Sequence, residues 1–191
     1  METIRTLLVA TLFLTSLTVW GQQTRWTDFE NAWNNYLSKP TDDNAEKAYR
    51  LLPDKILSGD YPNGGITGRI LSKIDQLNNL VQQRNRYALR LAFKLFTIAD
   101  GEYAEGLQIE IGKLISIDTK LFLQELKNHK QLIISLDGLV GNLGQDYVDR
   151  PELQKKEKEN RIRSLKKISD RDLVAVRDEC LTQLNRQIKK T

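Results

Sequence analysis

The chain is poor in the residue types that build most metal and nucleophile sites. Its 191 residues contain one cysteine, Cys180, and one histidine, His129. An intrachain disulfide is therefore impossible, and zinc sites made of several His or Cys side chains are excluded. A chain of this length buries enough surface to fold without disulfides or metals. We accordingly expect no metal and no cofactor.

Sequence motifs for catalysis and nucleotide binding are also missing. There is no G-x-S-x-G elbow, and the glycines of "SLDGLVGNLGQDYVDRPE", residues 135–152, fit neither a dinucleotide fingerprint nor a P-loop. The carboxylates of this stretch lack the spacing of a calcium loop. We interpret it as a helix end and a connector, with Gly138 and Gly141 permitting close packing and Gly144 ending the helix. A ligand-binding loop is the alternative.

Strand signals are nearly absent, whereas apolar residues recur at helical spacing from residue 27 to residue 188. The pattern predicts an all-α domain of about nine helices, arranged as stacked antiparallel hairpins in a repeat or a bundle. Pro151 is expected in the first turn of a helix. The predicted helix starts are marked by Thr27, Asp43, Asn85, Asp149 and Ser169 with Asp172.

The N-terminal residues have the pattern of an export signal. Arg5 precedes an apolar run from Leu7 to Trp20, and no further charge follows until Arg25. Cleavage after Gly21 would make residues 1–21 a signal peptide and residues 22–191 the mature domain of 170 residues. A membrane-anchoring or core helix is the alternative. We expect a periplasmic or extracellular protein without a transmembrane segment after cleavage.

Positive charge is concentrated near the C-terminus. Residues 150–191 contain 13 Lys or Arg against 7 Asp or Glu, whereas the remainder has 16 against 18. The segment 155–167 is either a solvated helix face or a face for anionic lipid headgroups, cell-wall polymers or an acidic protein. Nucleic acid is not expected, because aromatic residues are not interleaved. The candidate binding residues are Lys155, Lys156, Arg163 and Lys167.

Lone polar or reactive residues are assigned structural roles. Cys180 lies on an apolar stripe of the last helix and is predicted to be buried and inert. His129 lies in "KNHKQ" at a helix end and is predicted to be a surface or capping residue. The aromatic residues near the N-terminus are expected in the core, with the rim of a recognition groove as the alternative: Trp26, Trp33, Tyr36 and Tyr49.

One segment carries a family resemblance. "ALRLAFKLFTIADGEYAEGLQIEIGKL", residues 88–114, resembles a HEAT-type repeat: an apolar helix, a turn with Asp100, and a second helix that ends on Ile111 to Leu114. It departs from that pattern at Ala104 and Gly106. The N-terminal hairpin more faintly resembles a tetratricopeptide unit. The resemblance implies stacked helical hairpins.

Two hypotheses of function follow. The first is an exported, non-enzymatic helical protein that binds another protein or an envelope component. The alternative is a small envelope-polymer hydrolase that uses a pair of carboxylates, which the 25 acidic residues permit but do not identify. The sequence leaves the ligand, the biological process and the oligomeric state open.

Overall fold

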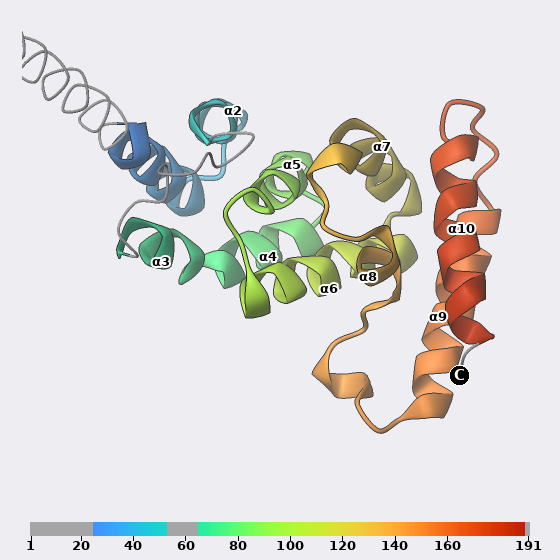
Figure 1. Ribbon diagram of the computed structural model, residues 1–191. Helices are drawn as coiled ribbons and strands as arrows, with labels where there is room; N and C mark the ends of the chain where they lie inside the picture. Colours follow the sequence, from blue (N-terminus) through green and yellow to red (C-terminus); the bar gives the residue numbers. More distant parts are fainter. Residues whose placement is uncertain (1–24, 53–64, 190–191) are drawn as a thin grey trace, which may run out of the picture. The chain divides into compact units, whose positions relative to one another are not determined.

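The computed structural model describes residues 25–52 and 65–189, and these ranges are helical and contain no strand (Figure 1). The all-α prediction is confirmed. The expected signal peptide, residues 1–21, lies outside the described residues. The contacts divide the chain into two compact units, with the boundary between Ile70 and Leu71. The expectation of one domain over residues 22–191 stays a prediction.

The first unit has an aromatic core. It contains a helix over residues 25–38, α2 (Asp42–Leu51) and α3 (Gly65–Leu71), which ends at the boundary. Trp26, Trp33 and Tyr36 are buried, as predicted, whereas Tyr49 is half-buried. Phe29 is also buried, and its ring centroid lies 6.2 Å from that of each tryptophan. Arg69 of α3 binds both carboxylate oxygens of Glu30 at 2.6 and 2.8 Å, which ties α3 to the first helix.

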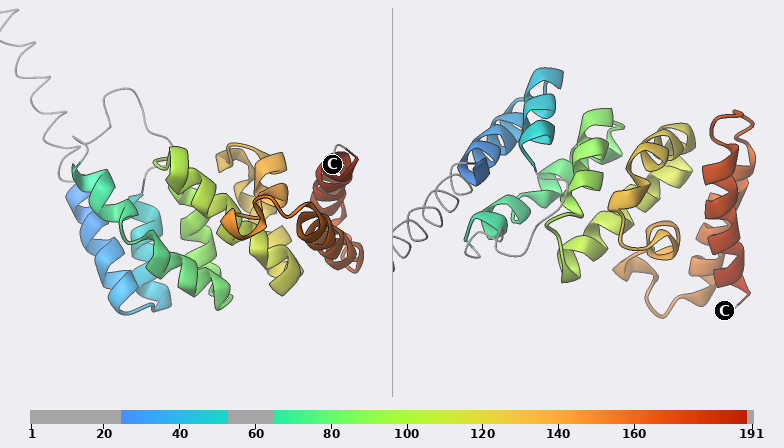
Figure 2. Two further views of the ribbon diagram at one scale, coloured as in Figure 1. Left: turned by 90° about the horizontal axis from the view of Figure 1, so that it is seen from below. Right: turned by 45° about the horizontal axis from the view of Figure 1, so that its top comes forward.

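The second unit is a stack of helices in which neighbours along the chain pack on one another (Figure 2). Helix α4 packs on α5 and α6, α5 also packs on α7, and α6 contacts α7, α8 and α9. Helix α10 packs on α8 and α9. The α-helices are α4 (Ile74–Gln82), α5 (Arg86–Leu95), α6 (Gly101–Ile117), α7 (Thr119–His129), α8 (Leu136–Gly141), α9 (Pro151–Lys166) and α10 (Val174–Ile188), with short 3-10 turns at Lys130–Leu132 and Gln145–Tyr147.

Several predicted helix starts are confirmed. The Asn85 side chain caps α5 by accepting a hydrogen bond from Ala88 N at 3.0 Å, and Pro151 occupies the first turn of α9. The expected continuous helix beyond Arg69 is interrupted at residues 72–73, which separate α3 from α4.

Other predicted starts are wrong by a few residues. Thr27 lies inside a helix that is already formed at residue 25. Thr41 caps α2 in place of Asp43, Arg150 precedes α9 in place of Asp149, and α10 begins after Leu173. Capping residues follow one another closely in "TDD", and backbone geometry selects among them.

The glycine stretch is a short helix followed by a connector, as interpreted, but the prediction that Gly144 ends the helix is wrong, because α8 ends at Gly141 with Asn142 as its C-cap. The helix is only α8, because the backbone is extended at Ile133 and Ser135. Gly144 has φ +87°, a conformation that favours glycine.

No helix within the described ranges combines the length and apolar character needed to cross a membrane.

The two lone residues have different outcomes. Cys180 is buried as predicted, and burial raises the pKa of its thiol to about 12. The surface prediction for His129 is wrong, since its ring is buried and stacks on Phe93 at 5.6 Å between centroids. The final turn of α7 is covered by α5, a contact between helices that the local sequence does not specify.

Candidate functional site

The predicted binding residues lie together on one exposed face of α9. Lys155, Lys156, Arg163 and Lys167 are all exposed, and Lys166 joins them. At 100° per residue these positions span about 120° of the helix circumference. None of the five forms an ion pair with another residue in the described part of the chain. We call these five residues the basic face.

The opposite side of α9 is anchored by a buried arginine. Arg161 is 1 % exposed, and its Nη1 donates to Val140 O at 2.7 Å and to Asn142 O at 3.4 Å. Its Nε lies 3.5 Å from Glu157 Oε1. Burial lowers the pKa of Arg161, and the neighbouring Glu157 opposes this shift. These hydrogen bonds hold α9 against the end of α8. The basic face therefore lies on a helix whose position is fixed by a buried side chain.

A groove of about 360 Å³ runs beside the basic face. Leu153 and Val148 are 45 % and 51 % exposed at this end of α9, and Leu153 lines the groove with Tyr147 and Lys156. Gln154 Nε2 donates to Tyr147 O at 2.8 Å, which holds the preceding turn on the helix. The apolar Leu153 is thus exposed beside the cationic Lys156.

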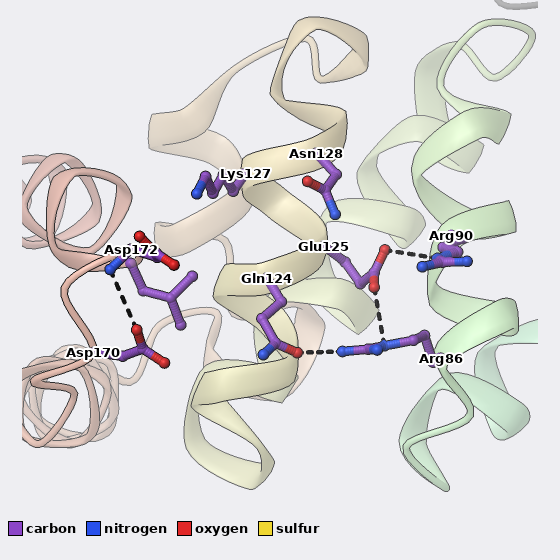
Figure 3. Close-up of a pocket in the computed structure, with 9 residues that line it drawn as sticks. Arg86, Arg90, Gln124, Glu125, Lys127, Asn128, Asp170 and Asp172 are labelled. Atoms are coloured by element: carbon purple, nitrogen blue, oxygen red, sulfur yellow. Dashed lines mark hydrogen bonds and ion pairs between the residues drawn. The ribbon is translucent and has the colours of Figure 1, made fainter.

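A second, strongly polar pocket of about 310 Å³ lies between α5, α7 and the connector from α9 to α10 (Figure 3). Arg86 and Arg90 come from α5, whereas Asp170 and Asp172 come from the connector. Figure 3 shows the two arginines on one side of α7 and the two aspartates on the other. The remaining lining residues are Gln124, Glu125, Lys127, Asn128 and Leu173.

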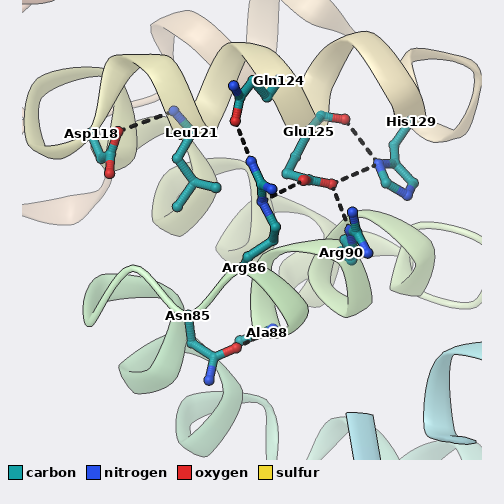
Figure 4. Close-up of polar contacts among 9 residues, drawn as sticks. All are labelled: Asn85, Arg86, Ala88, Arg90, Asp118, Leu121, Gln124, Glu125 and His129. Carbon is teal, nitrogen blue, oxygen red and sulfur yellow. Dashed lines mark hydrogen bonds and ion pairs between the residues drawn. The ribbon is translucent and has the colours of Figure 1, made fainter. Parts of the chain in front are cut away.

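Glu125 is the centre of this pocket's polar network (Figure 4). Its side chain is 1 % exposed, and its two oxygens lie 3.1 Å from Arg86 Nε and 3.1 Å from Arg90 Nε. The contact with Arg90 is a hydrogen bond, whereas Oε1 next to Arg86 has no hydrogen-bond donor among the described residues. The contact at Oε1 is therefore an ion pair without hydrogen-bond geometry.

His129 and Gln124 complete the network. His129 Nδ1 lies 2.9 Å from Glu125 O and 3.6 Å from Glu125 Oε2. Gln124 Oε1 accepts a hydrogen bond from Arg86. Two guanidinium groups share one carboxylate, so the α5 side of the pocket keeps one excess positive charge.

The aspartate side of the pocket is held ionised. A hydrogen bond from Lys120 lowers the pKa of Asp170, and the backbone N–H of Asp172 also donates to this carboxylate. The Lys120 Nζ to Asp170 Oδ2 distance is 3.2 Å. The Asp172 carboxylate is exposed and has no ion-pair partner among residues 25–52 and 65–189.

This pocket was not found by sequence reasoning. Arg90 and Glu125 are 35 residues apart, and neither belongs to a motif. The spacing of Arg86 and Arg90 by one helical turn was the only available signal. Within the described ranges no group of His, Cys, Asp and Glu residues is arranged to hold a metal ion.

Comparison with known proteins adds no relative. No protein-family model matches the chain, and neither a curated protein nor a solved structure matches it significantly. The fold class is all-α, and the described residues contain two candidate sites, the basic face and the polar pocket.

Proposed function

We propose that this chain is an exported, non-enzymatic helical protein that binds an anionic lipid surface of the cell envelope through α9. The observation that carries the proposal is the basic face, whose five exposed cations have no ionic partner within the described residues. Basic residues near an anionic surface contribute about 1 kcal/mol each.

The neighbouring apolar side chains favour lipid over an acidic protein or a cell-wall polymer. Leu153 is 45 % exposed and lines the groove with Lys156, and Val148, shortly before α9, is 51 % exposed. An interfacial helix binds by combining cations at the headgroup level with apolar side chains that enter the acyl boundary. A soluble polyanion would use the cations and leave both apolar side chains in water.

The hydrolase alternative is less well supported by the polar pocket. Glycoside hydrolysis needs a carboxylic acid that stays protonated beside an ionised partner. Lys120 lowers the pKa of Asp170, and two arginines bind the Glu125 carboxylate. The contact with Lys120 favours the ionised form of Asp170, so binding is the function we propose.

The proposal of repeat-like architecture is separate from the proposed binding surface. The segment 88–114 that resembles a HEAT-type unit corresponds to most of α5 and α6. We propose that it is a repeat-like hairpin, as is the fainter tetratricopeptide-like hairpin at the N-terminus. The test is to replace Ala104 and Gly106 by the residues usual at these positions of HEAT-type repeats and to measure whether the protein stays as stable.

The lipid proposal is tested by vesicle co-sedimentation. Vesicles containing phosphatidylglycerol should bind the protein, and vesicles of phosphatidylcholine alone should not. Changing Lys155, Lys156, Arg163 and Lys167 to Glu should reduce affinity by at least about a hundredfold, because four attractive contributions are lost. Unchanged affinity would overturn the proposal.

Two controls separate lipid binding from general charge. Reversal of Arg25, Lys39, Lys47 and Arg84, which are exposed and lie outside α9, gives the same change in net charge and should change affinity far less. Val148→Ser with Leu153→Ser should weaken vesicle binding but leave binding to a soluble polyanion unchanged. If the double serine variant keeps both vesicle binding and polyanion binding, the partner is a polyanion or an acidic protein and not a lipid surface. Parent and variants share one N-terminus, so any contribution of residues 1–21 cancels.

A further inference from the structure

The polar pocket between α5, α7 and the α9–α10 connector has an arrangement of charge that fits one class of small molecule. Arg86 and Arg90 lie at one end, and Asp170 and Asp172 lie at the other, where Lys127 also lines the pocket (Figure 3). The volume of about 310 Å³ is at the lower end of the range for small-molecule sites.

The arginine end has unused hydrogen-bonding capacity. Arg90 uses Nε for Glu125 and is 33 % exposed, and Arg86 is 47 % exposed. Within the described residues Glu125 is the carboxylate with which both arginines pair. A guanidinium group binds a carboxylate through two parallel N–H groups, so this end matches a ligand carboxylate.

The aspartate end matches a ligand cation. Lys120 neutralises Asp170, but Asp172 has no ionic partner in the described part of the chain. The connector that carries both aspartates is fixed, because Asp172 N donates to Asp170 Oδ1 at 3.3 Å and Arg177 Nη1 donates to Ile168 O at 2.5 Å. An ammonium group at this end would therefore meet a carboxylate that is already in place.

Between the two ends, α7 presents groups that match a peptide unit. Gln124 and Asn128 are one helical turn apart, and a side-chain amide carries both a donor and an acceptor. Glu125 lies between them in sequence, is 1 % exposed, and has one oxygen without a hydrogen-bond donor among the described residues. That oxygen is buried and lies 3.1 Å from Arg86 Nε, so a peptide unit would pair with the two side-chain amides instead, its carbonyl accepting from one and its N–H donating to one.

We infer that this pocket binds a small zwitterion of dipeptide size, with its carboxylate at Arg86 and Arg90 and its ammonium at Asp172. The site is separate from the basic face of α9, and the inference is independent of lipid binding.

Three ligands test the charge requirement. Alanyl-alanine is titrated against the full chain, with N-acetyl-alanyl-alanine and alanyl-alanine amide as matched compounds that lack the ammonium and the carboxylate respectively. Binding is followed by two-dimensional NMR of backbone and side-chain amides. We expect shifts at Gln124 and Asn128 with the free dipeptide, and at least about tenfold weaker binding of each capped form, since each loses a charged hydrogen bond.

Three variants locate the site. Asp172→Asn should weaken binding of alanyl-alanine at least about tenfold but leave the weaker binding of the N-acetyl form unchanged. Arg90→Gln should also weaken binding of alanyl-alanine, but it should leave the weaker binding of the amide form unchanged, because that form lacks the carboxylate. Asp75→Asn, on the exposed surface of α4, is the control and should change neither. Circular dichroism confirms the fold of each variant, and Asp172→Asn keeps the test valid if Arg90→Gln unfolds.

The inference is overturned by either of two results. One is the absence of shifts up to about 10 mM alanyl-alanine, above the weakest affinities expected of a specific site. The other is equal affinity for the free and the capped dipeptides, which would show that the opposed charges of the pocket do not select the ligand.

Discussion

At the scale of the residue, Arg161 shows how one side chain can be structural within a segment that is otherwise a charged surface. Its neighbours Asn160 and Arg163 are exposed, whereas its guanidinium group reaches Val140 O at 2.7 Å. This carbonyl belongs to the last turn of α8, where intrahelical donors are missing. The arginine therefore supplies a cap to another helix.

Replacement of Arg161 should cost more stability than any other change of a basic residue in α9. Arg161→Met would leave Val140 O buried without its donor and remove charged hydrogen bonds, for an expected loss of about 2–4 kcal/mol. Urea unfolding followed by circular dichroism measures the change.

The matched control for this change is Arg163→Met, on the exposed side of the same helix. It should stay within about 0.5 kcal/mol of the parent. Equal effects of the two substitutions would contradict the capping role of Arg161.

Residue-scale predictions from sequence were right where the neighbours along the chain decide the environment. Cys180 and Trp33 lie on apolar stripes and are buried. His129 was predicted to be a surface or capping residue because it lies at a helix end, yet its ring is buried and stacks on Phe93, 36 positions away. Local composition does not report which side of α7 meets α5.

At the scale of the element, Gly112 determines how closely α8 approaches α6. A Cβ at this position would lie 2.5 Å from Leu139 O and 3.0 Å from Arg161 Nη1. Both neighbours are constrained, since one is backbone and the other is a buried, hydrogen-bonded side chain. The helices can therefore pack only with glycine at this place.

Two glycine-to-alanine substitutions in the same helix should have opposite signs. Gly112→Ala is expected to destabilise by about 1–3 kcal/mol, because the backbone of α8 must shift. Gly106→Ala has nothing within 4 Å of the added Cβ and should stabilise by about 0.5–1 kcal/mol, since alanine favours helix.

Urea unfolding of both variants and the double variant checks this expectation. Each alanine raises intrinsic helix propensity equally, so the difference isolates the packing at Leu139 and Arg161. Stabilisation by Gly112→Ala would contradict the close approach of α8 and α6.

Element existence was largely predictable, and element bounds were less so. Asn85 and Pro151 mark helix starts because a side-chain cap and a fixed φ act locally. At Asp149, by contrast, a good capping residue adopts φ +58° and Arg150 precedes the helix. Competing local signals are resolved by packing, which the sequence pattern does not contain.

At the scale of the whole molecule, uneven charge and an apolar N-terminal run are the main signals for compartment and partner. Net charge is +4, and the excess lies in residues 150–191. The protein would contact the proposed lipid surface only after export. The position of signal cleavage is therefore a second test of the proposed function.

Export should remove residues 1–21. When the chain is produced from its own start codon in a secreting bacterial host, intact-mass spectrometry of the osmotic-shock fraction should find a species of 170 residues that begins at Gln22. Leu12→Arg with Leu14→Arg interrupts the apolar run, so this variant should remain full-length inside the cell. An uncleaved parent chain in the shock fraction would contradict the prediction.

The sequence by itself determined the all-α class, most helices and the exposure of Lys155, Lys156, Arg163 and Lys167, because helical periodicity and charge are properties of neighbouring residues. Only the tertiary structure decided the pocket around Glu125 and the burial of Arg161. Each depends on partners from other parts of the chain, 19 to 39 positions away. Such contacts follow from how helices pack, which no local pattern of residues specifies.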